Sequence, residues 1–248
     1  MRFRHLPNLR QLAAGLLLSA FAIPASWAGV LIDGTRVIYP AKEREVTVKL
    51  TNKGSSPVLM QVWADRGDPR AEPQDADAPF LITPPIFRLD PQKGQSVRVV
   101  FTGEKLPQDR ESLFWFNALE VPSLPQDADR NLMQIAVRSR LKLFYRPAGL
   151  PGNLPEAIKA VKWRVVPGAG GHVLRGENDS PYHLSYSSLV LEQGGKRHDT
   201  GGGMIAPYSR HEFSLPGFGG QVAGARLRYR WMSDHGVAPE QETALRQD

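Results

Sequence analysis

The chain has 248 residues, of which 41% are hydrophobic and 23% charged, and its formal net charge is +6. This is an ordinary globular composition, which excludes collagen-like, coiled-coil and wholly disordered chains. The sequence contains no cysteine, which excludes disulfides, thiolate catalysis and cysteine-ligated metal sites.

The first 28 residues have the pattern of a secretion signal. Three arginines precede an uncharged apolar stretch over Leu12–Ile23, and Ser26–Ala28 place small residues at the two positions that a signal peptidase reads. The apolar stretch is too short to span a bilayer. We therefore expect residues 1–28 to be a signal peptide and the mature chain to begin at Gly29. An exported chain without cysteine fits the bacterial periplasm, and we expect no stable membrane insertion after cleavage.

After the leader, apolar and polar residues alternate with the period of two that is typical of half-buried antiparallel strands. The clearest segments are Val46–Leu50, Val58–Val62 and Val97–Phe101. A denser apolar run over Leu113–Leu119 is typical of a strand at the centre of a sandwich. Apart from a short turn near Leu106–Arg110, no segment has the pattern of a helix.

One predicted strand is unusually long. Asn131–Tyr145 would extend for about 50 Å, roughly twice the length of a normal strand. Met133, Ile135 and Val137 lie in one phase of its alternation, and basic residues including Lys142 lie in the other. Two interpretations stay open from the pattern alone. The three apolar side chains either belong to the core of the first domain or form an edge offered to a partner strand.

The segment Arg146–Pro155 contains three prolines and two glycines, so it cannot continue a sheet and predicts a domain boundary. We expect one domain over residues 29–149 and a second over residues 150–248. Strands of the second domain are predicted at Trp163–Val166, Leu184–Leu191, His211–Leu215 and Ala225–Trp231. The predicted fold is all-β, with two immunoglobulin-like β-sandwich domains.

Candidate catalytic and metal-binding residues are few. The sequence has no nucleophile elbow, zinc-binding helix, Walker loop or dinucleotide fingerprint, so we expect no enzymatic activity, no cofactor and no nucleotide. His198 and Asp199 lie in a polar run that is typical of an exposed hairpin tip. Asp65 and the acidic residues that follow it lack the spacing of a calcium-binding loop and fit a long surface loop. Export and a mature net charge of +3 give no reason to expect nucleic acid as a partner.

Four tryptophans suggest an alternative function, that of an exported carbohydrate-binding β-sandwich protein. Trp63, Trp115, Trp163 and Trp231 are candidate stacking platforms for sugars. Each lies within an alternating apolar pattern, however, which favours packing in a core.

Several segments closely resemble the periplasmic pilus-assembly chaperones of the PapD-like family. The first is LPQDRESLFWFN at Leu106–Asn117, followed by MQIA at Met133–Ala136 and KLFYRP at Lys142–Pro147. TPP at Thr83–Pro85 and GTRVIY at Gly34–Tyr39 add to the resemblance. Together these segments cover the first domain almost entirely.

The resemblance is thinner in the second domain, where YRWMSDHG at Tyr229–Gly236 is similar to the last strand of the family. It implies two immunoglobulin-like domains in a boomerang arrangement with a cleft between them. It also implies the function of a chaperone that binds pilin or fimbrial subunits by donor-strand complementation and delivers them to an outer-membrane usher.

The resemblance assigns expected roles to five residues of the subunit-binding surface. Arg36 and Lys142 match the two cations that anchor the C-terminal carboxylate of a pilin subunit. Two cations that converge in a partly desolvated cleft repel one another unless an anion lies between them. Met133, Ile135 and Val137 match the apolar residues that the family inserts into the groove of an incomplete pilin.

The resemblance also implies a charged trio, Glu111, Arg146 and Asp234, that holds the two domains at a fixed angle. Exposed ion pairs contribute only about 0–1 kcal/mol each. We therefore expect this trio to set the orientation of the domains more than their stability.

Overall fold

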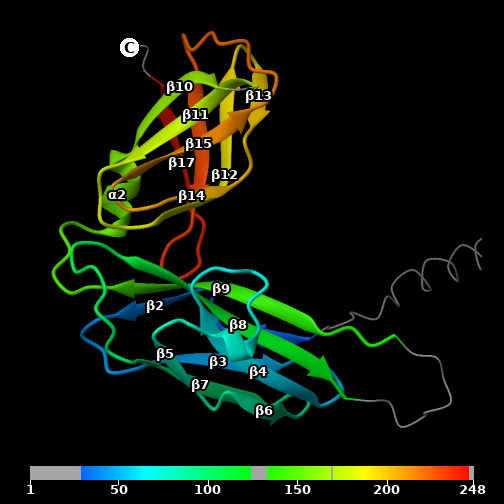
Figure 1. Cartoon of the computed structure of the whole chain (residues 1–248). Coiled ribbons are helices and arrows are strands. Elements are labelled where there is room, and N and C mark those ends of the chain that lie inside the picture. The colour runs from blue at the N-terminus through cyan, green and yellow to red at the C-terminus, as the bar shows by residue number, and fades with distance from the viewer. Residues whose placement is uncertain (1–28, 124–132, 169, 246–248) are drawn as a thin grey trace, which may run out of the picture.

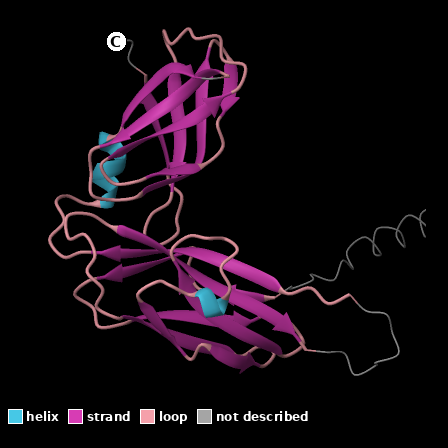
Figure 2. Cartoon of the chain, viewed as in Figure 1, coloured by secondary structure: helices cyan, strands magenta, loops and turns pink. Residues whose placement is uncertain are grey.

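The computed structural model describes residues 29–123, 133–168 and 170–245. Nearly all of its regular structure is β-strand (Figure 2). The elements in chain order are β1 (Val30–Ile32), β2 (Arg36–Pro40), β3 (Val46–Asn52), β4 (Val58–Asp65), η1 (Pro73–Asp75), β5 (Phe80–Thr83), β6 (Ile86–Leu89), β7 (Gly94–Phe101), β8 (Ser112–Pro122), β9 (Val137–Arg146), α2 (Leu154–Ala160), β10 (Lys162–Gly168), β11 (Gly171–Asn178), β12 (Leu184–Gln193), β13 (Lys196–Asp199), β14 (Gly203–Ile205), β15 (Ser209–Leu215), β16 (Arg226–Trp231) and β17 (Glu240–Ala244). Among these residues, no helix has the length and apolar character needed to cross a membrane.

The strands form two β-sandwiches that meet at an angle and give the molecule an L shape (Figure 1). In the first sandwich, a sheet of order β1-β3-β7-β5 packs against a sheet of order β2-β9-β8-β4-β6. The inward phase of the alternating strands fills the space between them, with Leu50, Val97 and Phe116 fully buried. The prediction of an all-β chain with two sandwich domains is confirmed.

Strand β9 is shorter than the sequence predicted. It begins at Val137, and residues 133–136 before it form no strand, while residues 131 and 132 lie outside the described residues. The ladder between β8 and β9 ends where Glu120 pairs with Val137, and β8 itself stops at Pro122. The prediction of one long strand over Asn131–Tyr145 is therefore wrong at its front, where residues 133–136 do not join the ladder although β8 continues to Pro122.

The second sandwich packs a sheet of order β10-β11-β15 against a sheet of order β13-β12-β16-β17, with β14 beside β12. Leu174, Leu189 and Leu227 are fully buried between the sheets. The sequence pattern did not predict β11, β13, β14 or β17. Of these, β17 carries a polar and charged alternation that no apolar count could detect.

The sequence pattern predicts no amphipathic helix of ordinary length, and it missed the seven-residue helix α2, which begins at Leu154 within the predicted domain boundary. The Asn153 side chain accepts a hydrogen bond of 3.0 Å from the Glu156 N–H, and Pro155 lies in the first turn. Both features are typical of a helix start. Leu154 and Ile158 anchor the helix in the second core. Residues 106–110, by contrast, are not helical.

Candidate functional site

The two cations that the sequence singled out lie side by side where the sandwiches meet. Strand β2 pairs with β9 in parallel, and the register places Arg36 directly opposite Lys142. Val37 and Leu143, the next residues on each strand, are buried in the first core. Because side chains alternate along a strand, Arg36 and Lys142 point away from that core.

Both cations reach across to the second domain. Arg36 donates from Nη1 to the Met232 carbonyl at 3.2 Å, and Lys142 Nζ lies 3.3 Å from Ser185 Oγ. Ser185 is itself buried, and its carbonyl accepts the N–H of Met232, so one strand pair of the second domain contacts both cations. The site is therefore built from both domains and depends on the angle between them.

Desolvation and mutual repulsion both act against the charged forms of this pair. Burial, and then the charge of Arg36, lower the pKa of Lys142. Burial also lowers the pKa of Arg36, and the charges of Asp234 and Glu111 offset part of that effect. Among the described residues, Arg36 Nε is buried without a hydrogen-bond partner. This arrangement favours an anion between the two cations.

The front of β9 presents a free edge next to the cations. Strand β2 pairs only with Lys142–Arg146, so in the described chain Val137–Leu141 has β8 on one side and no strand on the other. The exposed fractions of Met133, Ile135 and Val137 are 89%, 65% and 52%. The interpretation of these three residues as core is therefore wrong.

The predicted charged trio comes together at the domain junction. Arg146 Nε donates to Glu111 Oε1 at 2.7 Å, and its two Nη atoms donate to the Asp234 carboxylate at 2.7 and 2.8 Å. Burial disfavours this guanidinium, but the bonds to Asp234 and the charge of Glu111 outweigh burial and raise the pKa of Arg146. Glu111 also accepts the His183 N–H at 2.7 Å. The trio thus links the residue before β8, the last residue of β9 and the second domain.

A second charged network, which sequence analysis missed, lies on the outer face of the same sheet. Asp65 ends β4 and is completely buried, where the sequence placed it in a surface loop. It accepts hydrogen bonds from Asn117 at 2.7 Å, Arg138 at 3.3 Å and Arg140 at 2.8 Å. Arg138 and Arg140 also donate to Asn117 Oδ1, at 2.7 and 3.1 Å. The sequence did contain a sign of this network, because the alternating basic residues Arg138 and Arg140 of β9 require a carboxylate nearby.

The four candidate sugar-stacking tryptophans are covered. Trp63, Trp163 and Trp231 are buried. The fourth, Trp115, lies under the guanidinium of Arg140, whose central carbon is 4.7 Å from the ring centroid. Three of the four rings are therefore core residues and the fourth packs against an arginine, which favours a structural role over sugar stacking.

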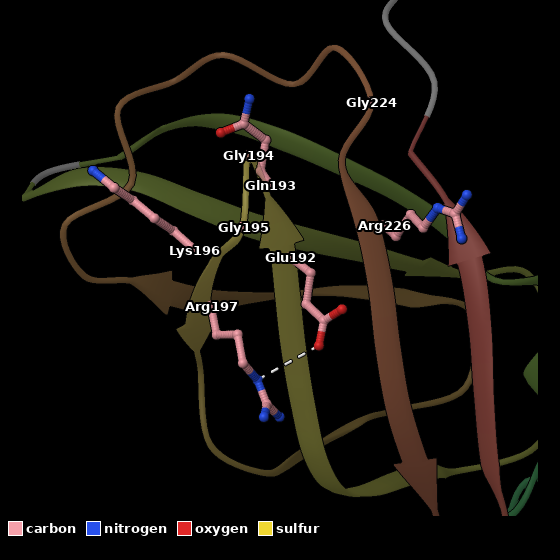
Figure 3. A pocket seen from close by; sticks show the side chains of 8 residues that line it. All are labelled: Glu192, Gln193, Gly194, Gly195, Lys196, Arg197, Gly224 and Arg226. Atoms are coloured by element: carbon pink, nitrogen blue, oxygen red, sulfur yellow. Dashed lines mark ion pairs between the residues drawn. The ribbon is translucent and has the colours of Figure 1, made fainter.

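The remaining candidate chemistry is dispersed. His198 lies in edge strand β13 with Nδ1 3.2 Å from the Pro216 carbonyl, and Asp199 accepts the Gly201 N–H. At the tip of the β12–β13 hairpin, Figure 3 shows Arg197 turned toward Glu192, with 3.5 Å between their charged atoms. No group of three His, Asp or Glu side chains able to hold a metal ion occurs within residues 29–123, 133–168 and 170–245.

Comparisons with known proteins agree with this geometry. The family description "Pili and flagellar-assembly chaperone, PapD N-terminal domain" matches residues 29–151, and "Pili assembly chaperone PapD, C-terminal domain" matches residues 156–243. The probable fimbrial chaperone YadV of Escherichia coli K12 is 44% identical over 225 residues, which cover 89% of this chain and 92% of that protein. Chaperone protein FimB/FhaD of Bordetella pertussis is 40% identical, covering 92% and 93%.

Solved structures show the same fold. The crystal structure of the YadV chaperone superposes with a TM-score of 0.76 at 42% identity, covering 88% of this chain and 100% of that one. The Salmonella enterica SafA pilin in complex with the SafB chaperone gives a TM-score of 0.72 at 27% identity, covering 87% and 96%. With both domains matched in order and relatives above 40% identity over most of its length, the chain belongs to the family of PapD-type pilus-assembly chaperones.

Proposed function

We propose that the mature chain works in the periplasm, where it binds pilin or fimbrial subunits by donor-strand complementation and delivers them to an outer-membrane usher. Residues 1–28 serve as the export signal, and the chain acts by binding alone, without catalysis. The SafA–SafB complex, in which a pilin is bound to a chaperone of the same fold, supports the choice of subunit.

One observation carries the proposal: a free strand edge with exposed apolar residues leads directly to a pair of desolvated cations. Val137 and Lys142 are five positions apart on β9, which corresponds to about 17 Å along an extended strand. A subunit strand lying along this edge would pair its main chain with Val137–Leu141 and present its C-terminal carboxylate to Arg36 and Lys142. The carboxylate is a feature that every subunit carries, so the anchor suits a chaperone with several clients.

The three exposed apolar side chains give the edge its preference for incomplete subunits. Met133, Ile135 and Val137 follow one another at intervals of two residues, the spacing that places side chains on one face of an extended chain. Inserted into a pilin that lacks its last strand, they would fill pockets that are otherwise exposed to water. Glu111, Arg146 and Asp234 would hold the two domains at the angle that aligns the edge with the anchor.

The proposal is tested with an N-acetylated peptide that copies the C-terminal strand of a pilin, in free-acid and amidated forms. The free acid should bind more tightly because only it makes charge-assisted hydrogen bonds to Arg36 and Lys142. Raised salt should weaken the free acid more than the amide, since screening acts on charged contacts. Isothermal titration at two salt concentrations measures both effects.

The matched variants are Arg36→Ala and Lys142→Ala. Each should cost about 2–5 kcal/mol of binding to a purified subunit while circular dichroism shows an unchanged fold. Equal affinity of acid and amide, or unchanged subunit binding in both variants, would contradict the anchor. Binding of an oligosaccharide with neither peptide bound would favour the carbohydrate-binding alternative.

A further inference from the structure

Glu120 joins the two sheets of the first sandwich at the end where the free edge of β9 begins. It lies on β8 opposite Val137, in the same phase as the buried residues Phe116 and Ala118. Its Oε2 accepts the N–H of Val30 at 2.9 Å. Val30 opens β1, a three-residue edge strand of the other sheet. This one carboxylate therefore links β1 to β8, beside Val137 at the start of β9.

The same carboxylate faces Gly29. A Cβ built on Gly29 would lie 3.0 Å from Oε2 and 3.6 Å from Oε1 of Glu120, and the φ angle of Gly29 is +88°. Both facts favour glycine here, because a side chain would be strained and would crowd the carboxylate. The carbonyl of Gly29 accepts the N–H of Lys53 at 3.2 Å, which holds the residue in place. The Glu120 carboxylate thus lies beside the backbone of Gly29 and accepts the N–H of the next residue, Val30.

Glu120 is half-buried and lacks a basic partner. In the described ranges of the chain, no Lys, Arg or His nitrogen lies within 4 Å of its carboxylate, although ion pairs are frequent elsewhere on the molecule. A partly buried carboxylate with one backbone donor and no cation is an incomplete site for a positively charged group. A cation on the backbone of Gly29 would complete this site, because the carboxylate lies beside that residue.

We infer that this cation is the α-ammonium group that signal cleavage creates on Gly29. The inference rests on the proposed cleavage after Ala28 and is independent of subunit binding. Hydrolysis of the Ala28–Gly29 bond consumes one water and yields a carboxylate on Ala28 and an ammonium on Gly29. An amide with one N–H and no charge becomes a cation with three donors beside Glu120. Maturation would thereby add an ion pair that fastens β1 beside Val137.

The pairing predicts a raised pKa for the α-amino group of the mature protein, because a nearby carboxylate stabilises its charged form. Titratable neighbours are few: Lys53 meets Gly29 through its main chain, and Val30 and Val137 carry no charge. The rate of reductive methylation of the α-amino group with ¹³C-formaldehyde, followed by NMR as a function of pH, reports this pKa separately from the lysines.

The test uses the mature protein purified from the periplasm, with mass spectrometry to define its first residue. Glu120→Gln keeps an acceptor for the Val30 N–H and removes the charge, and it should speed α-amino labelling about tenfold near pH 7.5, one pKa unit. Glu43→Gln, at an exposed position, is the matched control and should leave the rate unchanged. A first residue other than Gly29, or equal labelling rates in the wild type and Glu120→Gln, would overturn the inference.

Discussion

The two halves of β9 share one alternating pattern but have different surroundings. Along Lys142–Tyr145 the strand has β8 on one side and β2 on the other, and Leu143 is fully buried. Along Val137–Leu141 it has β8 alone, and Val137 is more than half exposed. A period of two therefore marks a core face and a partner-facing edge equally well. The strands that flank each half decide which one it is.

The front half needs its own support because it lacks β2. Arg138 and Arg140 point to the outer face, where their guanidiniums lie over the rings of Trp63 and Trp115 at 4.6 and 4.7 Å from the centroids. Both converge on the buried carboxylate of Asp65. Cation–π contacts and a shared carboxylate thus support Val137–Leu141 from the outer face of the sheet, and the hydrogen-bonding edge of this segment stays unpaired.

The largest expected contrast comes from placing the same charge in each half. Leu143→Asp should unfold the first domain or cost several kcal/mol, because it buries an unpaired carboxylate in the core. Ile135→Asp should change the free energy of unfolding by less than about 0.5 kcal/mol, since the side chain is 65% exposed. Urea unfolding followed by circular dichroism measures both.

Binding of a pilin subunit should be lost in Ile135→Asp even though its stability is unchanged. Ile135→Asp is expected to abolish capture of a pilin subunit by a protein whose fold and unfolding midpoint are unchanged. A loss of stability as large as that of Leu143→Asp would show that Ile135 packs in the core, and the distinction between the two halves would fail.

The next largest effect should come from the network that supports the free edge. Asp65→Ala leaves two arginines without their carboxylate, and breaking a buried pair in this way costs about 3–5 kcal/mol. Hydrogen exchange should increase at the amides of Val137–Leu141 more than in the rear half. Asp77→Ala, which removes an exposed partner of Arg66, is the control and should cost less than about 1 kcal/mol. Equal effects of the two variants would contradict the support role.

Local periodicity was enough to predict the two β-sandwiches, and the motifs were enough to single out Arg36 and Lys142. Arg36 and Lys142 are more than 100 residues apart, and only the resemblance to a family placed them together before the register was known. The Asp65 network was missed for the same reason: its members lie on three strands, and Asp65 sits among acidic residues that read as a loop. The front limit of β9 lies where its pairing with β8 stops, at Val137, and the alternating pattern of the segment does not reveal that point.

A smaller effect is expected at the far end of the rear half, where Arg146 meets the second domain. Asp234→Asn removes the charge opposite the two Nη atoms of Arg146 but keeps an acceptor, and the pair is partly exposed, so about 1 kcal/mol of stability should be lost. Because the anchor is built from both domains, the affinity for the free-acid peptide should fall when the angle between the domains becomes more variable. Small-angle X-ray scattering of the free protein checks the angle. An unchanged scattering profile and affinity would limit the trio to a local role.

The smallest effect concerns Lys142, where the two halves of β9 meet. Burial and the charge of Arg36 lower the pKa of Lys142 below the 10.5 of a free lysine, so the folded protein holds this proton less tightly than the unfolded chain does. Between the two pKa values the unfolded state binds more protons, and this residue therefore makes stability increase with pH in that window. A bound carboxylate has the opposite influence and raises the pKa of Lys142 again.

Affinity for the free-acid peptide should be constant below the pKa of Lys142 in the free protein and decline above it, by no more than about tenfold per pH unit. The amidated peptide should lack this decline, and Lys142→Arg, which stays charged, should lack it with either peptide. Titration calorimetry in two buffers of different ionisation enthalpy detects the proton uptake directly. A pH dependence shared by acid and amide would show that Lys142 senses something other than the chain terminus.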